Sequence, residues 1–151
     1  MSTPSVKSKI VKRFLELLVP LKQQKGIREI ERKNTLFLTT TTVPAIHLVI
    51  GHEVSGVDDE RGYTCVFPAM LKITLEDGND PAAKCDELVG WIQEKIEADE
   101  QLVSGGAPLA SKVTYMGEMP FTEELAKPKG GSVISFEVEY RRRRAQPGVS
   151  Y

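Results

Sequence analysis

The chain has 151 residues, a length typical of one domain, and its 20 basic side chains nearly balance 21 acidic ones, for a net charge of -1. This near-neutral total argues against a dedicated nucleic-acid binder, which normally carries a clear basic excess. Because 40% of the residues are hydrophobic and 27% are charged, the composition is that of an ordinary globular protein with its own core.

Cysteine usage and apolar segments indicate the compartment. Cys65 and Cys85 lie far apart in the sequence; a disulfide is one interpretation, but we expect two small buried residues in a reducing compartment. No stretch approaches the roughly 20 apolar residues of a membrane span. The N-terminal segment interleaves lysines with apolar residues, unlike a secretory signal. We therefore expect a protein made in the cytoplasm, with no membrane partner.

The first predicted element is an amphipathic helix over residues 5–19. Pro20 should stop or kink it, because proline lacks the amide donor and clashes with the preceding turn. Such a helix must pack against another element. Its apolar residues recur at the spacing of one helix face: Ile10, Phe14, Leu17, Leu18 and Leu21.

Strand patterns follow Gly26. Residues 27–42 are rich in threonine and β-branched side chains, which favours one strand or a short hairpin. Residues 44–51 are mostly apolar at both odd and even positions, which predicts a central strand covered on both faces. Residues 51–62 are polar and predict an acidic turn that contains Asp58, Asp59 and Glu60.

The longest predicted strand covers residues 63–75, where apolar side chains occupy alternate positions. Pro68 lies in mid-strand and predicts a bulge or an edge. A second helix over 81–98 should begin with Asp80 as N-cap and Pro81 in the first helical position. We expect a loop at 104–108, strands at 111–118 and 133–143, and a polar linker between those two strands.

This order predicts an α+β fold: a largely antiparallel (mixed) β-sheet with two main helices packed on it, in one domain over 1–151. Residues 145–151 are predicted to form a flexible C-terminal tail. The expected core includes Leu71, Ile73, Leu75, Trp91, Phe136 and Val138.

No catalytic signature emerges, so we do not expect an enzyme. His47 and His52 are five positions apart, and an odd spacing along a strand places side chains on opposite faces, so they make a poor ligand pair. The sequence therefore predicts no metal or cofactor site. The adjacent carboxylates fall in polar loops, where charged side chains are normally solvated.

Four consecutive arginines, Arg141, Arg142, Arg143 and Arg144, end the last predicted strand. As a strand continuation, they would alternate between its two faces. Three interpretations remain open: solvated charge that protects an edge, contact with phosphate, or salt bridges across a subunit contact. The acidic turn at Asp58, Asp59 and Glu60 is the candidate partner of these arginines on a neighbouring copy of the chain.

Several segments in this order resemble the tail terminator family of long-tailed bacteriophages, also called tail completion or minor tail protein U-like proteins. The likeness covers most of the chain, from the N-terminal helix to Tyr140, and rests on order, length and the Tyr-Arg ending. The segments are Val43-Pro44-Ala45 before an apolar strand that ends at Gly51-His52-Glu53, Trp91-Ile92 in the second helix, and Phe136-Glu137-Val138-Glu139-Tyr140-Arg141.

The resemblance implies a sheet with helices on one side and a virion protein at the head-proximal end of the tail. There a homohexameric ring would cap the tail tube, stop its growth and meet a head-completion or neck protein. The implied partners are the chain itself, the major tail tube protein and, in a contractile tail, a sheath protein; DNA only passes through the lumen. The four arginines and the segment after them depart from the family pattern.

Two alternatives stay open: another neck or tail-tube protein such as a head-tail connector, or a nucleic-acid-binding module that uses Arg141–Arg144.

Overall fold

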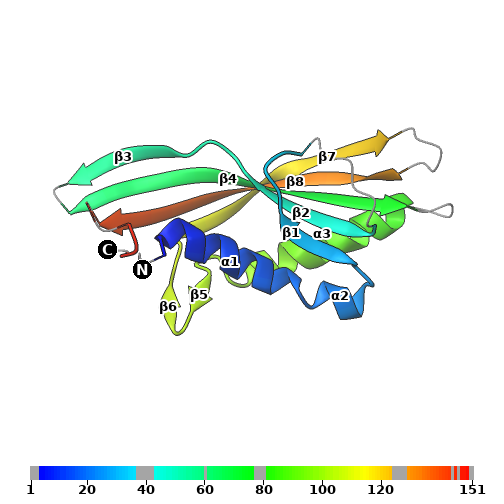
Figure 1. The fold of residues 1–151 in the computed structure, drawn as a ribbon, viewed down its shortest axis with the longest axis horizontal. Coiled ribbons are helices and arrows are strands. Elements are labelled where there is room, and N and C mark those ends of the chain that lie inside the picture. Colours follow the sequence, from blue (N-terminus) through cyan, green and yellow to red (C-terminus); the bar gives the residue numbers. More distant parts are fainter. Residues whose placement is uncertain are drawn as a thin grey trace.

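The computed structural model describes residues 4–36, 43–59, 61–76, 81–123, 129–143, 145 and 147–149, with the backbone alone at 58, 59, 76, 81, 82, 122, 123 and 129. One long, twisted sheet carries both main helices (Figure 1). In chain order the elements are α1 (Val6–Leu18), α2 (Leu21–Gln24), β1 (Glu29–Arg32), β2 (Ala45–Ile50), β3 (Val54–Asp59), β4 (Gly62–Glu76), α3 (Pro81–Glu97), β5 (Val103–Ser104), β6 (Ala107–Pro108), β7 (Lys112–Glu123) and β8 (Lys129–Arg143).

The strand order in the main sheet is β1-β2-β4-β8-β7, with β3 also paired to β4. The β1–β2 pair is parallel, and the other described pairs of this sheet are antiparallel. The predicted α+β class is confirmed: a mixed, mostly antiparallel sheet with two main helices in a single domain.

The sheet is built on β4 and β8, which are 15 residues each and pair without a register shift from Gly62 opposite Arg143 to Glu76 opposite Lys129. The other side of β4 is shared between two shorter strands. β2 pairs with residues 69–74 and β3 with residues 62–66. Pro68 lies between these two partners, where its missing N–H interrupts no strand pair, and its carbonyl accepts a hydrogen bond from the Gly51 amide (2.8 Å).

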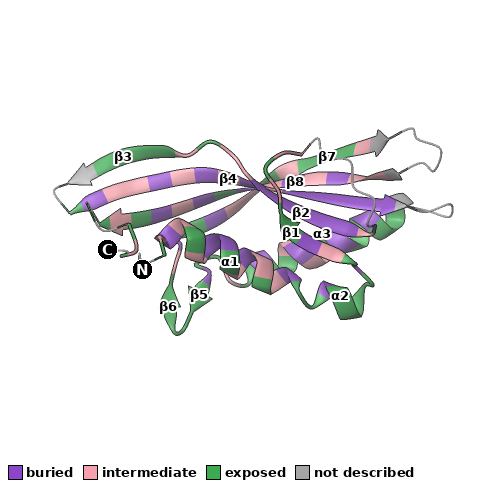
Figure 2. Ribbon diagram, viewed as in Figure 1, coloured by how far each residue is buried: buried purple, intermediate pink, exposed green. Residues whose placement is uncertain are grey.

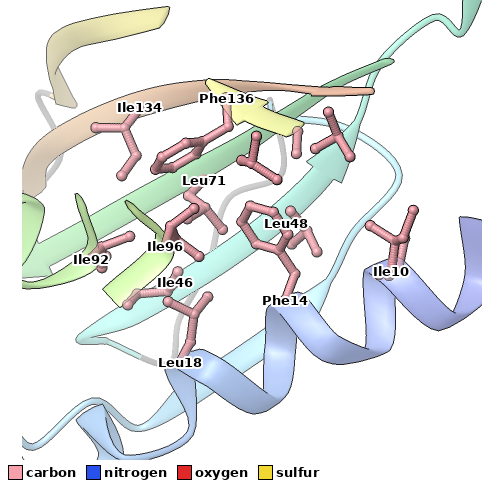
Figure 3. Packing of buried hydrophobic residues seen from close by; sticks show 14 of the residues in the cluster. Ile10, Phe14, Leu18, Ile46, Leu48, Leu71, Ile92, Ile96, Ile134 and Phe136 are labelled. Atoms are coloured by element: carbon pink, nitrogen blue, oxygen red, sulfur yellow. The ribbon is translucent and has the colours of Figure 1, made fainter. Parts of the chain in front are cut away.

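One face of the sheet, called here the helix face, holds the core. Odd-numbered residues of β4 and even-numbered residues of β8 point toward α1 and α3 (Figure 3). Phe14 of α1 meets Phe136 of β8 edge to face, with ring centroids 5.7 Å apart. The other labelled side chains of this layer are Ile10, Leu18, Ile46, Leu48, Leu71, Ile92, Ile96 and Ile134.

Both helices begin where the sequence places them. The Ser5 hydroxyl caps α1 by accepting the Ser8 amide (3.0 Å), and Pro81 opens α3. After Pro20 the chain continues into the short helix α2. Among the expected core residues, Trp91 is only half-buried, with Lys95 Nζ 5.4 Å from its ring centroid, so its placement in the core was wrong. Its ring lies at the margin of α3's buried side.

Three predicted irregular segments contain regular structure. The acidic turn at 51–62 was wrong, because residues 54–59 form β3; the loop at 104–108 contains the β5–β6 hairpin; and β7 and β8 extend well into the expected linker. These strands were missed because they lie at or beyond the margin of the helix layer. There, burial on one face does not impose an alternating apolar pattern on the sequence. Within 27–42, β1 is the described strand, and residues 37–42 lie outside the described residues, as does Asp80.

Cys65 and Cys85 are both buried and unpaired, as expected. In the described part of the tail, the Pro147 carbonyl accepts the Val6 amide (2.7 Å) and the Val149 carbonyl accepts the Arg143 amide (2.7 Å). These bonds bring the tail beside α1 and the end of β8; its flexibility stays a prediction.

The close approach of β4 and β8 gives a direct test. A Cβ added at Gly131 would overlap the carbonyl oxygen of Ile73, whereas one added at Gly56 of β3 would meet nothing within 4 Å. Because backbone has to shift to relieve the first overlap, Gly131→Ala should lower the free energy of unfolding by about 1–3 kcal/mol. Urea unfolding measures it, with Gly56→Ala as the matched control. Equal stability of the two variants would contradict the β4–β8 register.

Candidate assembly surface

The predicted site residues gather at one end of the sheet, called here the sheet tip: β3, residues 62–66 of β4 and residues 139–143 of β8. At this end, β3, β4 and β8 lie side by side at the N- and C-terminal side of the molecule (Figure 1). Two cross-strand rows define its faces. Val57, Tyr63 and Arg142 form a row on the helix face, and Gly56, Thr64 and Arg141 form a row on the opposite face.

Arg141, Arg142 and Arg143 continue β8 as predicted, and they divide between the two faces. Arg142 lies over the ring of Tyr63, with its guanidinium carbon 4.6 Å from the ring centroid. Arg141 and Arg143 are exposed on the opposite face. Arg144 lies outside the described residues.

The acidic segment lies at the same tip of the same chain. Asp59 is opposite Gly62, and Gly62 is opposite Arg143, so the acidic and basic segments are two strand spacings apart, about 10 Å. Asp58 and Asp59 are described by backbone alone, and Glu60 lies outside the described residues. The structure therefore places both candidate segments at one end, while their pairing between copies stays a prediction.

Glu53 also belongs to this candidate site, although the sequence pattern did not distinguish it from the rest of the acidic segment. The Tyr140 hydroxyl donates to Glu53 Oε1 (2.6 Å), and Lys7 Nζ of α1 is 3.7 Å from the same oxygen. Burial, and then the hydrogen bond to Glu53, raises the pKa of Tyr140 far above its usual value. Through these contacts with Tyr140 and Lys7, Glu53 holds the segment between β2 and β3 against the core. No local pattern links residues 53 and 140, which are brought together by the sheet.

β3 itself is exposed on both faces. Its residues 54–57 are all exposed, with Val54 at 63% and Val57 at 62% (Figure 2). Among the described residues it pairs with β4 alone. An edge strand of this kind presents unpaired amides and carbonyls, and β3 has none of the lysines or prolines that commonly block pairing at edges.

A second surface lies on the opposite face of the sheet, farther from the tip. A groove of about 670 Å³ is bordered by the apolar side chains of Met70, Met116, Met119, Phe121 and Val133. Lys72 Nζ, 4.9 Å from the Phe121 centroid, donates to the Leu36 carbonyl (2.8 Å). Because residues 37–42, which follow Leu36, lie outside the described residues, we assign this groove no ligand.

The histidines do not combine into a site. His47 is buried, and its Nε2 is 3.0 Å from Glu29 Oε2, a hydrogen bond that lowers the pKa of Glu29. His52 is exposed. In the described part of the chain, no three His, Cys, Asp or Glu residues are grouped to hold a metal, and no helix is long and apolar enough to cross a membrane.

A scan against protein-family models finds no match for this chain. A search of curated proteins finds no similar sequence.

The Tyr140–Glu53 bond gives a prediction with a matched control. Tyr140→Phe removes a hydrogen bond to a carboxylate and should lower the free energy of unfolding by about 1.5–3 kcal/mol, measured by urea denaturation. Tyr115 also packs its ring edge to face, with its centroid 5.5 Å from that of Phe136, and no hydrogen bond joins its hydroxyl to another described residue. Tyr115→Phe should therefore change stability by less than about 0.5 kcal/mol. Equal losses would show that the hydroxyl of Tyr140 stabilises nothing.

The charges at the sheet tip give a second prediction. Replacing exposed Arg141 and Arg143 with Glu should weaken self-association, and adding Asp58→Lys and Asp59→Lys should restore part of it. Each exposed pair is worth about 0–1 kcal/mol, so the effect should need several changes and should fade in high salt. Sedimentation equilibrium measures it. If the fourfold variant associates no better than the arginine variant, these segments do not pair.

Proposed function

We propose that this chain is a structural protein of a phage virion that caps the completed tail tube as a ring. In this role it ends tube polymerisation and offers a surface to the head-completion or neck protein. The proposal makes it a non-catalytic protein that acts by contacts with copies of itself, with the tube protein and with the neck.

The observation that carries the proposal is the sheet tip. It extends the sheet with an exposed strand, β3, and it holds acidic and basic segments at one end. Exposed strand edges and interspersed charge are features of surfaces that join protein subunits. The placement of α1 and α3 on a single face of a mostly antiparallel sheet also agrees with the fold that the resemblance to tail terminators implies.

The physics of rings explains how such a protein would stop polymerisation. A contact between two different surfaces, repeated by rotation, closes into a ring with two unlike faces. One face is complementary to the last ring of the tube, and the other does not template a further tube subunit. Growth of the tube therefore ends at this ring, and the free face becomes the attachment surface for the head.

Passage of DNA limits the charge that the ring can present to its lumen. Clustered arginines that faced the lumen would bind phosphates and retard the DNA. Arg142 is held over Tyr63 at the helix face, whereas Arg141 and Arg143 are on the opposite face, so the three side chains do not form one cluster. Under the nucleic-acid-binding alternative, the purified chain would instead bind duplex DNA with an affinity that falls steeply as salt rises.

The decisive prediction concerns tails assembled without this protein. Tubes should overrun their normal length and fail to join heads, because nothing ends polymerisation or forms the attachment surface. Electron microscopy of lysates from a deletion phage measures both properties, with complementation by the intact gene as control. Tails of normal length that attach to heads would remove the proposed function. Tails of normal length that fail to attach would favour the alternative, a different neck protein.

A further inference from the structure

We infer that β3 of one copy pairs, as an antiparallel strand, with the first part of β7 of the next copy. The inference rests on the proposed ring and identifies the contact that forms it. Both strands are edges: among the described residues β3 pairs only with β4, and β7 pairs only with β8. They lie on opposite sides of a four-strand unit, β3-β4-β8-β7, so that one copy offers β3 where its neighbour offers β7.

The remaining described edges are less suited to pairing. β1 is four residues long, and three of its residues are charged. The second part of β7 contains Pro120 and follows a register shift between Tyr115 and Gly117, where Gly117 has a φ of 140°. These features commonly block strand addition. The regular stretches that remain are 54–57 in β3 and 112–115 in β7.

The faces of the sheet restrict the register. Ser55 and Val57 are on the helix face of β3, opposite Cys65 and Tyr63, and Val113 and Tyr115 are on the helix face of β7, opposite Val138 and Phe136. A sheet that continues from one copy to the next keeps its faces, so helix-face residues must lie opposite one another. The strands run antiparallel, since β3 and β7 have opposite directions within each chain.

Charge selects one of the registers that keep the faces. With Val57 opposite Val113, Gly56 falls opposite Thr114, and the acidic end of β3 meets Lys112, which is exposed at the start of β7. The acidic end of β3 then extends past Lys112 toward the end of β8, beside which residues 147–149 of the tail lie. This strand pair thus places the acidic end of β3 of one copy next to Lys112 of the other.

The resulting stagger is compatible with ring closure. Within one chain Val54 and Lys112 share a row through Val66 and Glu139. Placing the next copy's Val57 beside Val113 shifts that copy along the strands by about one residue for every strand it contributes. A shift of ~3.3 Å for every ~4.8 Å of width tilts the strands by about 35°, within the range of closed barrels.

A disulfide tests the register directly. Gly56→Cys and Thr114→Cys in one chain should form a disulfide between copies under mild oxidation, because residues directly opposite on paired strands are within disulfide reach. A Cβ at Gly56 meets nothing within 4 Å, and the native Cys65 and Cys85 are buried. Within one chain the two positions are three strand spacings apart, at least about 14 Å, too far to bridge. The expected product is a ladder of covalent oligomers.

The matched control is Gly56→Cys with Lys112→Cys, which is on the same face but two residues away and should cross-link much less. Either cysteine alone should give no covalent dimer; a dimer from Gly56→Cys alone would indicate that β3 pairs with β3 and overturn the inference. So would stronger cross-linking at residue 112, absence of cross-links at a concentration where the native chain is oligomeric, or a chain that stays monomeric up to its solubility limit.

A second pair of variants avoids cysteine chemistry. Val57→Lys adds a charge at an exposed edge position and should make the protein monomeric where the native chain associates, without lowering its melting temperature appreciably. Val19→Lys, at a comparably exposed valine (51%) at the end of α1, should associate normally. Equal association of both variants overturns the inference. If the cross-links form but deletion of the protein leaves tail length and head attachment normal, the strand pairing stands and the proposed function fails.

Discussion

The uninterrupted pairing of β4 with β8 is the constraint on which the rest of this structure depends. Fifteen residues of each strand stay in register, and their side chains on the helix face form the floor on which α1 and α3 pack. Gly131 permits the close approach of the two backbones near Ile73. Because strands of this length are longer than the layer formed by α1 and α3, the pair extends beyond the core at one end.

In the proposed assembly, that extension would separate stability from subunit contact within a single sheet. In the half covered by helices, β2 and β4 are buried on almost every residue, and even His47 and Lys72 are enclosed there. At the sheet tip, burial falls off, and the Tyr140–Glu53–Lys7 contacts and the tail bonds help to join the strands to α1. Substitutions in β3 can therefore change what the protein binds with little effect on its core.

A protein that assembles through strand edges has to control which edges pair. Here the charges of β1, the register shift of β7 and Pro120 oppose pairing at many edge positions, and β3 has a register shift of its own between Val57 and Asp59. The regular edge stretches are therefore 54–57 in β3 and 112–115 in β7. This distribution gives two unlike edges, the requirement for a contact that repeats around a ring instead of ending in a symmetric dimer. In the proposed ring, the arginines and aspartates at the tip would act on register and partner choice more than on affinity.

The sequence by itself determined the elements that bury a periodic face. The 3.6-residue spacing of Ile10, Phe14 and Leu18 defined α1, Pro81 defined the start of α3, and strict alternation defined β4 and most of β8, because burial imposes those periods. From these patterns followed the α+β class and the burial of both cysteines. Arg141, Arg142 and Arg143 were also placed correctly at a strand end, since they continue the alternation of β8.

Only the tertiary structure decided what happens where burial does not impose a period. β3 reads as a polar turn, and it is a strand because β4 offers an unpaired edge beyond the end of β2. Trp91 has a large apolar side chain of the kind usually found in a core, but it is only half-buried, because it lies at the margin of the helix layer. The Glu53–Tyr140 bond and the shared position of the acidic and basic segments join residues about 80 positions apart. Such contacts are set by strand order and register, which a single sequence does not specify locally.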